Sequence, residues 1–239
     1  MNNYKYIGSE LNLFGLAKNW KKYCYVVINK YLGEDVLEVG AGIGSATKSL
    51  CCSSHRRWLC LEPDNSLVET LESRTDLPVC CEIQQGTLSN LSEKEQFNTI
   101  IYIDVLEHIE DDHGEIKLAV KHLQPGGFLI VLSPAHQWLF SEFDLAIGHY
   151  RRYNRNTLKK LTTNGLLPIR FLYLDSVGLL ASLSNRFLQQ KTPTLQQIKL
   201  WDRLMVPISV ILDPVLRYNL GKSIVGIWQK EYSLECKKH

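Results

Sequence analysis

Short apolar runs alternate with segments of helical spacing along most of the chain. Buried strands that alternate with helices are typical of an α/β protein with a mostly parallel sheet covered on both faces. We therefore predict an α/β fold. The apolar runs expected to be strands are residues 36–39, 57–61, 78–83, 97–103, 128–132, 168–174 and 222–229.

Two further stretches carry helical spacing outside this alternation. Residues 10–31 predict one or two amphipathic helices ahead of the first strand, and Trp20 lies among their apolar residues. About 47 residues separate the last two expected strands, and segments 177–188 and 195–216 have helical spacing there. Pro207 and Pro214 are expected to break or kink the second segment.

An acid stands inside the first strand, directly before a glycine loop. Gly40, Gly42 and Gly44 allow sharp turns and close approach of a ligand to the backbone. The dinucleotide pattern G-x-G-x-x-G needs a glycine where this chain has Ser45. An uncompensated buried polar group costs roughly 2 to 7 kcal/mol, so Glu38 needs a partner. The amino group of S-adenosylmethionine (SAM) would supply one, whereas the pyrophosphate of NAD would be repelled.

This segment resembles the first motif of class I SAM-dependent methyltransferases, and the resemblance extends over roughly residues 30–175. Glu62 follows Gly42 by 20 residues, the spacing at which doubly wound folds place an acid on ribose hydroxyls. Asp104 ends the fourth strand as in the family's fourth motif, and a Pro-Gly-Gly turn precedes the fifth. The implied cofactor-binding residues are Glu38, Gly40, Ala41, Gly42, Gly44, Glu62, Pro63, Thr87, Leu88 and Asp104.

The resemblance also implies the topology. We expect a Rossmann-like doubly wound sheet of about seven strands, with the last strand antiparallel, in a single domain spanning 1–239. Its parts would be an N-terminal helical cap (1–33), a SAM-binding core (34–175), a helical insert (176–221) and a terminal strand (222–230).

One family position departs from the pattern. Many relatives carry an acid after the third strand that contacts the adenine amino group, and this chain has Thr87 there. The adenine contact would then fall to backbone groups of Thr87 and Leu88.

Two histidines are candidates for a general base. His136 follows the fifth strand directly, where an imidazole could take a proton from an acceptor hydroxyl, and His149 is the second candidate. The alternative is that His136 only caps or packs its loop.

A basic segment with two tyrosines follows. Tyr150, Arg151, Arg152 and Tyr153 are expected to bind the acceptor together with Trp20 of the cap, although Trp20 also fits simple core packing. Because paired arginines can bind carboxylate or phosphate groups and tyrosines can stack on a ring, we expect a small acceptor that is anionic or sugar-like. Alternatively, Asn154 or Asn156 caps a helix with an exposed basic face. Residues 143–153 resemble a subgroup of bacterial methyltransferases linked with polysaccharide or secondary-metabolite pathways.

The amino-acid composition and net charge limit the kinds of partner and the cellular location that we expect. The formal net charge is only +2 and no nucleic-acid module is recognisable, so nucleic acid is not expected. The start lacks a signal-peptide core and no apolar run would span a bilayer, which predicts a cytoplasmic protein. Seven cysteines without C-x-x-C or zinc spacing predict reduced structural thiols. Monomer and homodimer both remain open, and the apolar insert leaves peripheral membrane contact open.

These features predict an enzyme that transfers a methyl group from SAM to an oxygen by direct in-line displacement, releasing S-adenosylhomocysteine. The alternatives are an N- or carboxyl-methyltransferase of similar build and a non-catalytic SAM-binding partner protein. No metal cofactor is expected, because Asp111 and Asp112, which follow Asp104 in the chain, have the positions of a helix N-terminus.

Overall fold

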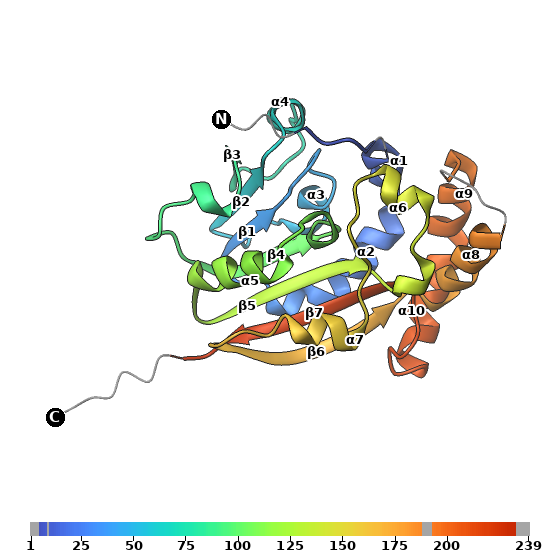
Figure 1. Cartoon of the computed structure of the whole chain (residues 1–239). Coiled ribbons are helices and arrows are strands. Elements are labelled where there is room, and N and C mark those ends of the chain that lie inside the picture. Colours follow the sequence, from blue (N-terminus) through green and yellow to red (C-terminus); the bar gives the residue numbers. More distant parts are fainter. Residues whose placement is uncertain (1–4, 9, 188–192, 233–239) are drawn as a thin grey trace.

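A seven-stranded sheet forms the centre of the protein (Figure 1). The structure is a computed structural model, and it describes residues 5–8, 10–187 and 193–232. The strand order of the sheet is β3-β2-β1-β4-β5-β7-β6. Within the described chain, β7 runs antiparallel to both of its neighbours and the pairs from β3 to β5 are parallel. The predicted doubly wound sheet with an antiparallel last strand is confirmed. The strands are β1 Asp35–Val39, β2 Arg57–Glu62, β3 Cys81–Gln85, β4 Phe97–Ile103, β5 Leu123–Pro134, β6 Leu166–Leu174 and β7 Ser223–Lys230.

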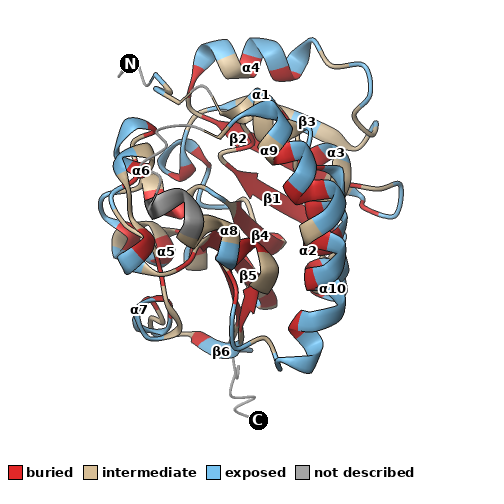
Figure 2. Ribbon diagram, turned by 90° about the vertical axis from the view of Figure 1, so that its right-hand side faces the viewer, coloured by how far each residue is buried: buried red, intermediate tan, exposed pale blue. Residues whose placement is uncertain are grey.

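Helices cover both faces of the sheet, as the alternation of elements predicts. Figure 2 shows α2, α3 and α10 on one side of the buried strands and α5 and α7 on the other. The α-helices are α1 Leu11–Gly15, α2 Lys18–Ile28, α3 Thr47–Leu50, α4 Asn65–Glu72, α5 Asp112–Lys121, α6 Glu142–Ala146, α7 Arg155–Lys160, α8 Ser176–Phe187, α9 Leu195–Leu200 and α10 Val206–Val215. Short 3-10 turns are η1 Asn29–Tyr31, η2 Leu88–Asn90, η3 Leu106–His108 and η4 Gln137–Leu139.

Alternate residues of the central strands enter two apolar cores. In β1, Val36 packs with the α2 and insert side, whereas Leu37 packs with the α5 side. This period of two follows from the pleat of a strand. Since both faces are covered, all five residues of β1 are buried, Glu38 included.

The borders of two strands differ most from the sequence prediction. The third strand begins at Cys81, later than expected. β5 begins at Leu123 and includes the Pro-Gly-Gly segment that was expected to be a turn. That segment stays in the sheet because the register with β4 shifts between Phe97 and Thr99, which accommodates the irregular backbone.

The insert between β6 and β7 is helical, as predicted. The expected 177–188 helix is α8, but residue 188 and the four residues after it lie outside the described chain, as do residues 1–4 and 9 of the predicted cap. The second expected helix is not broken: α9 continues through a π-helical turn, η5 Trp201–Met205, into α10. Pro207 stands in the first turn of α10, where its missing N–H is tolerated, and Pro214 stands near the helix end.

Three buried carboxylates attach the insert to the rest of the chain. Asp175 accepts hydrogen bonds from Ser209 Oγ at 2.7 Å and Trp201 Nε1 at 2.6 Å. Asp213 of α10 accepts from the Tyr23 hydroxyl at 2.7 Å. Asp202 accepts from the backbone N–H of Trp20 in α2 at 2.9 Å. The insert therefore packs on the N-terminal helices and the sheet of its own chain.

The outer side of the insert keeps apolar side chains in solvent. Ile211 and Val215 of α10 are 70% and 74% exposed. In the described part of the chain, no helix is long and apolar enough to cross a membrane.

Candidate active site

A cavity of about 1260 Å³ opens at the carboxyl ends of the strands, the edge at which open α/β sheets bind ligands. The loops after β1, β2, β3, β4 and β5 line it, together with residues of α1, α2, α6 and the insert. Of the predicted site residues, the lining includes Trp20, Glu38, Gly40, Ala41, Gly42, Glu62, Pro63, Thr87, Asp104, His149, Tyr150 and Arg152.

The glycine loop after β1 adopts the left-handed conformations expected of it. Gly40, Gly42 and Gly44 have φ values of 69°, 56° and 72°. The backbone N–H groups of Gly40 and Ala41 donate to the Leu61 carbonyl at 2.7 and 3.2 Å. Both N–H groups are therefore already used inside the protein. The loop lets a ligand approach the backbone closely, but these two donors are not free to bind it. Gly44 does not line the cavity, because it faces Leu71.

Glu38 is satisfied by its own chain. Its Oε2 accepts hydrogen bonds from Thr47 Oγ1 and Trp58 Nε1, each at 2.7 Å. The partner that this buried carboxylate needs is therefore supplied at Oε2 by the chain itself, so its burial does not by itself require a ligand ammonium. Burial still raises the pKa of Glu38 to about 7, against these hydrogen bonds. Glu38 lines the cavity, so its contact with the cofactor stays a prediction.

Glu62 is held rigidly at the end of β2. Its Oε2 accepts from the Gly42 N–H at 2.8 Å and its Oε1 from the Asp64 N–H at 3.0 Å. Burial raises the pKa of Glu62, and these two backbone hydrogen bonds oppose that rise. Each oxygen keeps lone-pair capacity for a further donor. This carboxylate therefore couples the glycine loop to the position predicted for a ribose.

Replacing Glu62 by alanine is expected to weaken SAM binding by about tenfold or more, since a hydrogen bond to a charged group contributes about 1.5–3 kcal/mol. Isothermal titration calorimetry with SAM measures the change. Glu72→Ala, which removes an exposed acid from α4, is the matched control and is expected to bind as the unmodified chain does. Equal affinities for both variants would remove Glu62 from the cofactor site.

The predicted adenine contact receives mixed support. Thr87 lines the cavity, but its backbone N–H donates to Asn90 Oδ1 at 2.8 Å. Leu88 is buried in the core on the α5 side and does not line the cavity. The backbone donor expected at Thr87 is thus already used within the η2 capping box.

Asp104 has the most unusual environment of the predicted residues. Its φ is +54°, a conformation that aspartate tolerates but that costs energy. It is exposed toward the cavity, and no hydrogen-bond donor from the described residues reaches its carboxylate. Desolvation by the surrounding protein raises the pKa of Asp104 to about 6, although the charges of His149 and Lys222 oppose this rise. An unpartnered acid is therefore presented to any ligand in the cavity.

Tyr6 and Glu10, which come before α1, also line the cavity, and the sequence did not predict this. The Tyr6 N–H donates to Asp64 Oδ2 at 2.6 Å, and the Tyr6 hydroxyl donates to Glu10. The Tyr6 ring meets the His108 ring edge-on, with centroids 5.6 Å apart. Trp20 also borders the cavity but mainly packs against Trp201, at 5.8 Å between centroids.

His149 is fixed by a carboxylate behind it. Its Nδ1 lies 2.8 Å from Asp144 Oδ1, and Arg152 holds the same carboxylate through Nε and NH2 at 2.8 and 2.9 Å. Burial lowers the pKa of His149, but the hydrogen bond to Asp144 and the charge of Glu107 outweigh it and raise the pKa above its usual value. Since Nδ1 must carry the proton shared with Asp144, the Nε2 lone pair is left to accept one.

Glu107 was missed by sequence reasoning. It is fully buried, its Oε2 accepts from Ser133 Oγ at 2.9 Å, and its Oε1 lacks a hydrogen-bond partner among the described residues. This Oε1 lies 3.9 Å from His149 Nε2. Burial raises the pKa of Glu107 above its usual range. Ligand atoms of Glu107, His108 and His149 all lie within 4.8 Å of one another, so these three side chains could also hold a metal ion.

His136 lies outside this arrangement. It does not line the cavity; its Nε2 lies 3.0 Å from the Gly221 carbonyl oxygen, and its ring stacks on Tyr173 at 4.8 Å between centroids. These contacts agree with the alternative that His136 packs its loop. Of the two candidate bases, only His149 lines the cavity, where His108 is a further histidine.

Both arginines that were expected to bind the acceptor contact carboxylates of the chain itself. Arg152 pairs with Asp144, and Arg151 pairs with Asp112 Oδ2 at 2.7 Å, so the chain's own carboxylates occupy both guanidinium groups. Tyr153 is buried and donates its hydroxyl to Asp112 at 2.8 Å. Sequence could not reveal these partners, which lie 8 to 41 residues away. Tyr150 is half exposed and stays a candidate for acceptor contact.

Two helix termini were interpreted correctly from sequence. Asp111 caps α5 and accepts from the Gly114 N–H at 2.9 Å. Asn154 caps α7 and accepts from the Thr157 N–H at 2.9 Å. The acids after Asp104 therefore serve helix α5 and its neighbours.

Residues 37–131 match the family model described as a methyltransferase domain. No curated protein matches the chain. Solved structures share its fold across nearly the whole length. A SAM-dependent methyltransferase from Clostridium acetobutylicum ATCC 824 has a TM-score of 0.57 at 12% identity, covering 90% of this chain and 92% of that one.

Two further similar structures differ in what they catalyse. The N-methyltransferase NodS from Bradyrhizobium japonicum WM9, in complex with S-adenosylhomocysteine, has a TM-score of 0.57 at 14% identity, covering 90% of this chain and 88% of that one. The [4+2]-cyclase SpnF has a TM-score of 0.61 at 12% identity, covering 95% of both chains. Likeness at these identities establishes the fold.

Proposed function

We propose that this chain is a class I SAM-dependent methyltransferase and that it methylates a hydroxyl oxygen of a small-molecule acceptor, with His149 as general base. The observation that carries this proposal is the His149–Asp144 pair at the cavity wall, clamped by Arg152. An alcohol must lose its proton during transfer, and an imidazole oriented by a buried carboxylate is suited to receive it.

The residues around the cavity fit SAM. The glycine loop provides a close-lying backbone, Glu62 offers a carboxylate for hydroxyl groups, and Asp104 presents an unpartnered carboxylate to a cation. When bound, SAM supplies a methyl group on a positively charged sulfur. The volume of about 1260 Å³ leaves room for an acceptor beside it.

The proton route follows from the hydrogen bonds. The acceptor O–H would donate to His149 Nε2 while His149 Nδ1–H stays on Asp144. As the methyl group passes to the oxygen, its bond to the sulfonium sulfur would break with the electron pair staying on sulfur. His149 Nε2 would take the hydroxyl proton, and Asp144 would stabilise the resulting imidazolium. Arg152 keeps Asp144 ionised and in place: hydrogen bonds from His149 and Arg152 lower the pKa of Asp144 despite its burial. Asp144 and Arg152 are positioning residues.

An acceptor panel tests the proposal. The full chain is incubated with SAM and pools of alcohols, sugars, amines or carboxylic acids, and S-adenosylhomocysteine is measured by mass spectrometry. Product formed only with hydroxyl-bearing pools is expected. Product from amine or acid pools alone would contradict O-transfer, and SAM binding without product from any pool would favour a non-catalytic SAM-binding protein.

An amine acceptor is the second candidate, because Glu107 Oε1, which has no hydrogen-bond partner among the described residues, and the Asp104 carboxylate could bind an amino group. The N-methyltransferase among the similar structures shares only the fold with this chain. For this function His149 would be dispensable, since an amine nucleophile is activated by losing its proton to water before transfer.

The pH dependence of kcat/KM follows from the direction of the His149 pKa shift. A general base must be neutral, and the pKa of His149 is raised above 6.5, so activity is expected to rise with pH across neutrality and level off above the raised pKa. A pH profile of initial rates measures this. In His149→Gln the rising limb should disappear, and a variant that retains it would assign the limb to another group.

A further inference from the structure

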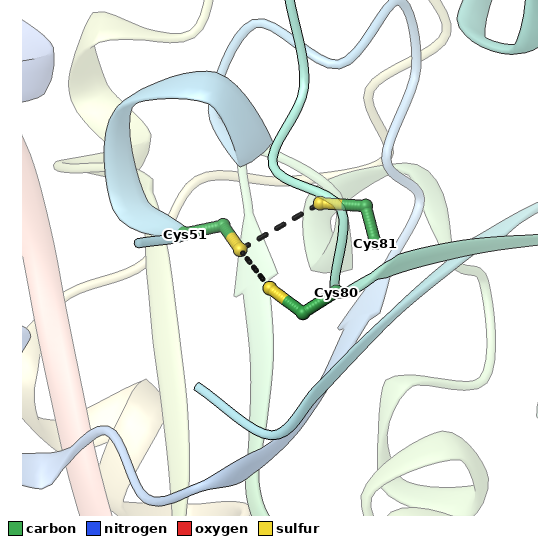
Figure 3. Close-up of side chains that lie close together, drawn as sticks. All are labelled: Cys51, Cys80 and Cys81. Atoms are coloured by element: carbon green, nitrogen blue, oxygen red, sulfur yellow. Dashed lines mark hydrogen bonds between the residues drawn. The ribbon is translucent and has the colours of Figure 1, made fainter. Parts of the chain in front are cut away.

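The structure brings three cysteines together on the far side of the cofactor cavity. Cys51 follows α3, whereas Cys80 and Cys81 lie at the start of β3 (Figure 3). The Sγ of Cys51 is 3.4 Å from that of Cys80 and 3.6 Å from that of Cys81. The register pairs Cys81 with Trp58, near the start of β2. The cluster therefore lies at the amino ends of the strands, opposite the edge that holds the cavity.

The spacing of these sulfur atoms suits a metal ion. All three Sγ atoms lie within 4.8 Å of one another. Bonds of about 2.3 Å at tetrahedral angles place two thiolate ligands about 3.8 Å apart, so small outward movements would admit Zn²⁺. A disulfide needs a separation of about 2.05 Å, and joining one pair would leave the third thiol without its partner.

The burial of the three cysteines and their access to solvent are compatible with a metal site. Cys51 is buried, while Cys80 and Cys81 are half-buried, so an ion can reach the cluster from solvent. Figure 3 shows the Cys51 sulfur pointing between the other two side chains. Fixed thiols from two separate segments are ligands of the kind that soft cations prefer.

We propose that Cys51, Cys80 and Cys81 bind one Zn²⁺ ion as thiolates, with the fourth position open to water. The three thiols release three protons as the three S–Zn bonds form. The ion would cross-link the segment after α3 to β3 and would stabilise the fold without entering the methyl-transfer reaction. Sequence spacing did not suggest this site, because Cys51 and Cys80 are 29 residues apart.

Zinc uptake by the full-length chain tests the proposal. The reduced protein is equilibrated with Zn²⁺, freed of unbound ion by gel filtration, and analysed for metal by mass spectrometry. One ion per chain is expected for the unmodified protein, and none for Cys51→Ser, Cys80→Ser or Cys81→Ser. Cys52→Ser is the matched control, since its thiol contacts Ser54 at 3.0 Å instead, and it should retain the ion.

A measurement on the unmodified chain tests the proposal even if the serine variants fail to fold. Zn²⁺ is expected to raise the melting temperature and to protect Cys51, Cys80 and Cys81 from alkylation, as mapped by peptide mass spectrometry, while Cys52 stays reactive. Absence of bound zinc in the unmodified chain, equal protection of Cys52, or retention of zinc by the three serine variants would each overturn the proposal.

Discussion

Replacing His149 by glutamine is expected to lower kcat by about 10²- to 10⁴-fold, the usual contribution of a general base, while SAM affinity stays unchanged. Glutamine can still donate toward Asp144, but it cannot accept the acceptor's proton at neutral pH. Initial rates and calorimetry with SAM separate the two effects. The experiment requires the acceptor that the panel identifies.

His136→Gln is the matched control for this prediction. His136 contacts the Gly221 carbonyl and the Tyr173 ring away from the cavity, so its replacement should leave kcat and its pH profile nearly unchanged. If His136 proved essential and His149 dispensable, His136 would be the general base instead.

Asp144→Asn separates positioning from proton transfer. Asparagine preserves the shape but removes the charge that raises the pKa of His149, so the rising limb of the pH profile should move to lower pH. A purely structural role of Asp144 would change stability and leave that limb in place.

Replacing Asp213 by alanine is expected to lower the free energy of unfolding by about 3 kcal/mol or more. Three donors would lose their partner: the Tyr23 hydroxyl, the Asp175 N–H and the Ser176 N–H, at 2.7, 2.6 and 3.0 Å. Each buried donor left without a partner costs about 1–3 kcal/mol. Urea unfolding followed by circular dichroism measures the loss.

Tyr23→Phe provides the comparison, because it removes only one of these hydrogen bonds. Its expected cost is about 1 kcal/mol, since Asp213 keeps its two backbone donors. If Asp213→Ala were no more destabilising than Tyr23→Phe, the carboxylate would not be what attaches the insert to α2 and β6.

Local patterns predicted the local features of this protein. The order of strands and helices follows from apolar periodicity, because a strand buried on both faces and an amphipathic helix carry their signals within a few residues. Helix caps such as Asp111 and Asn154 act over three residues and were equally readable. Glu62 was placed at the cavity because the strand-loop-helix unit fixes its distance from the glycine loop.

Partners distant in sequence were not predictable in this way. Glu38 appeared to need a ligand because its donors, Thr47 and Trp58, come from α3 and β2. The arginine pair appeared free because Asp112 and Asp144 reach it only in the folded chain. Both expectations concern charges whose partners within the chain depend on tertiary contacts.

The sequence by itself determined the fold class, the edge of the sheet that binds the cofactor and the glycine loop that faces it, since short-range backbone geometry and burial set all three. Only the tertiary structure decided which histidine reaches the cavity, what the arginines bind and which cysteines meet. Those outcomes depend on side chains from several segments converging at one point, and no spacing along the chain encodes that convergence.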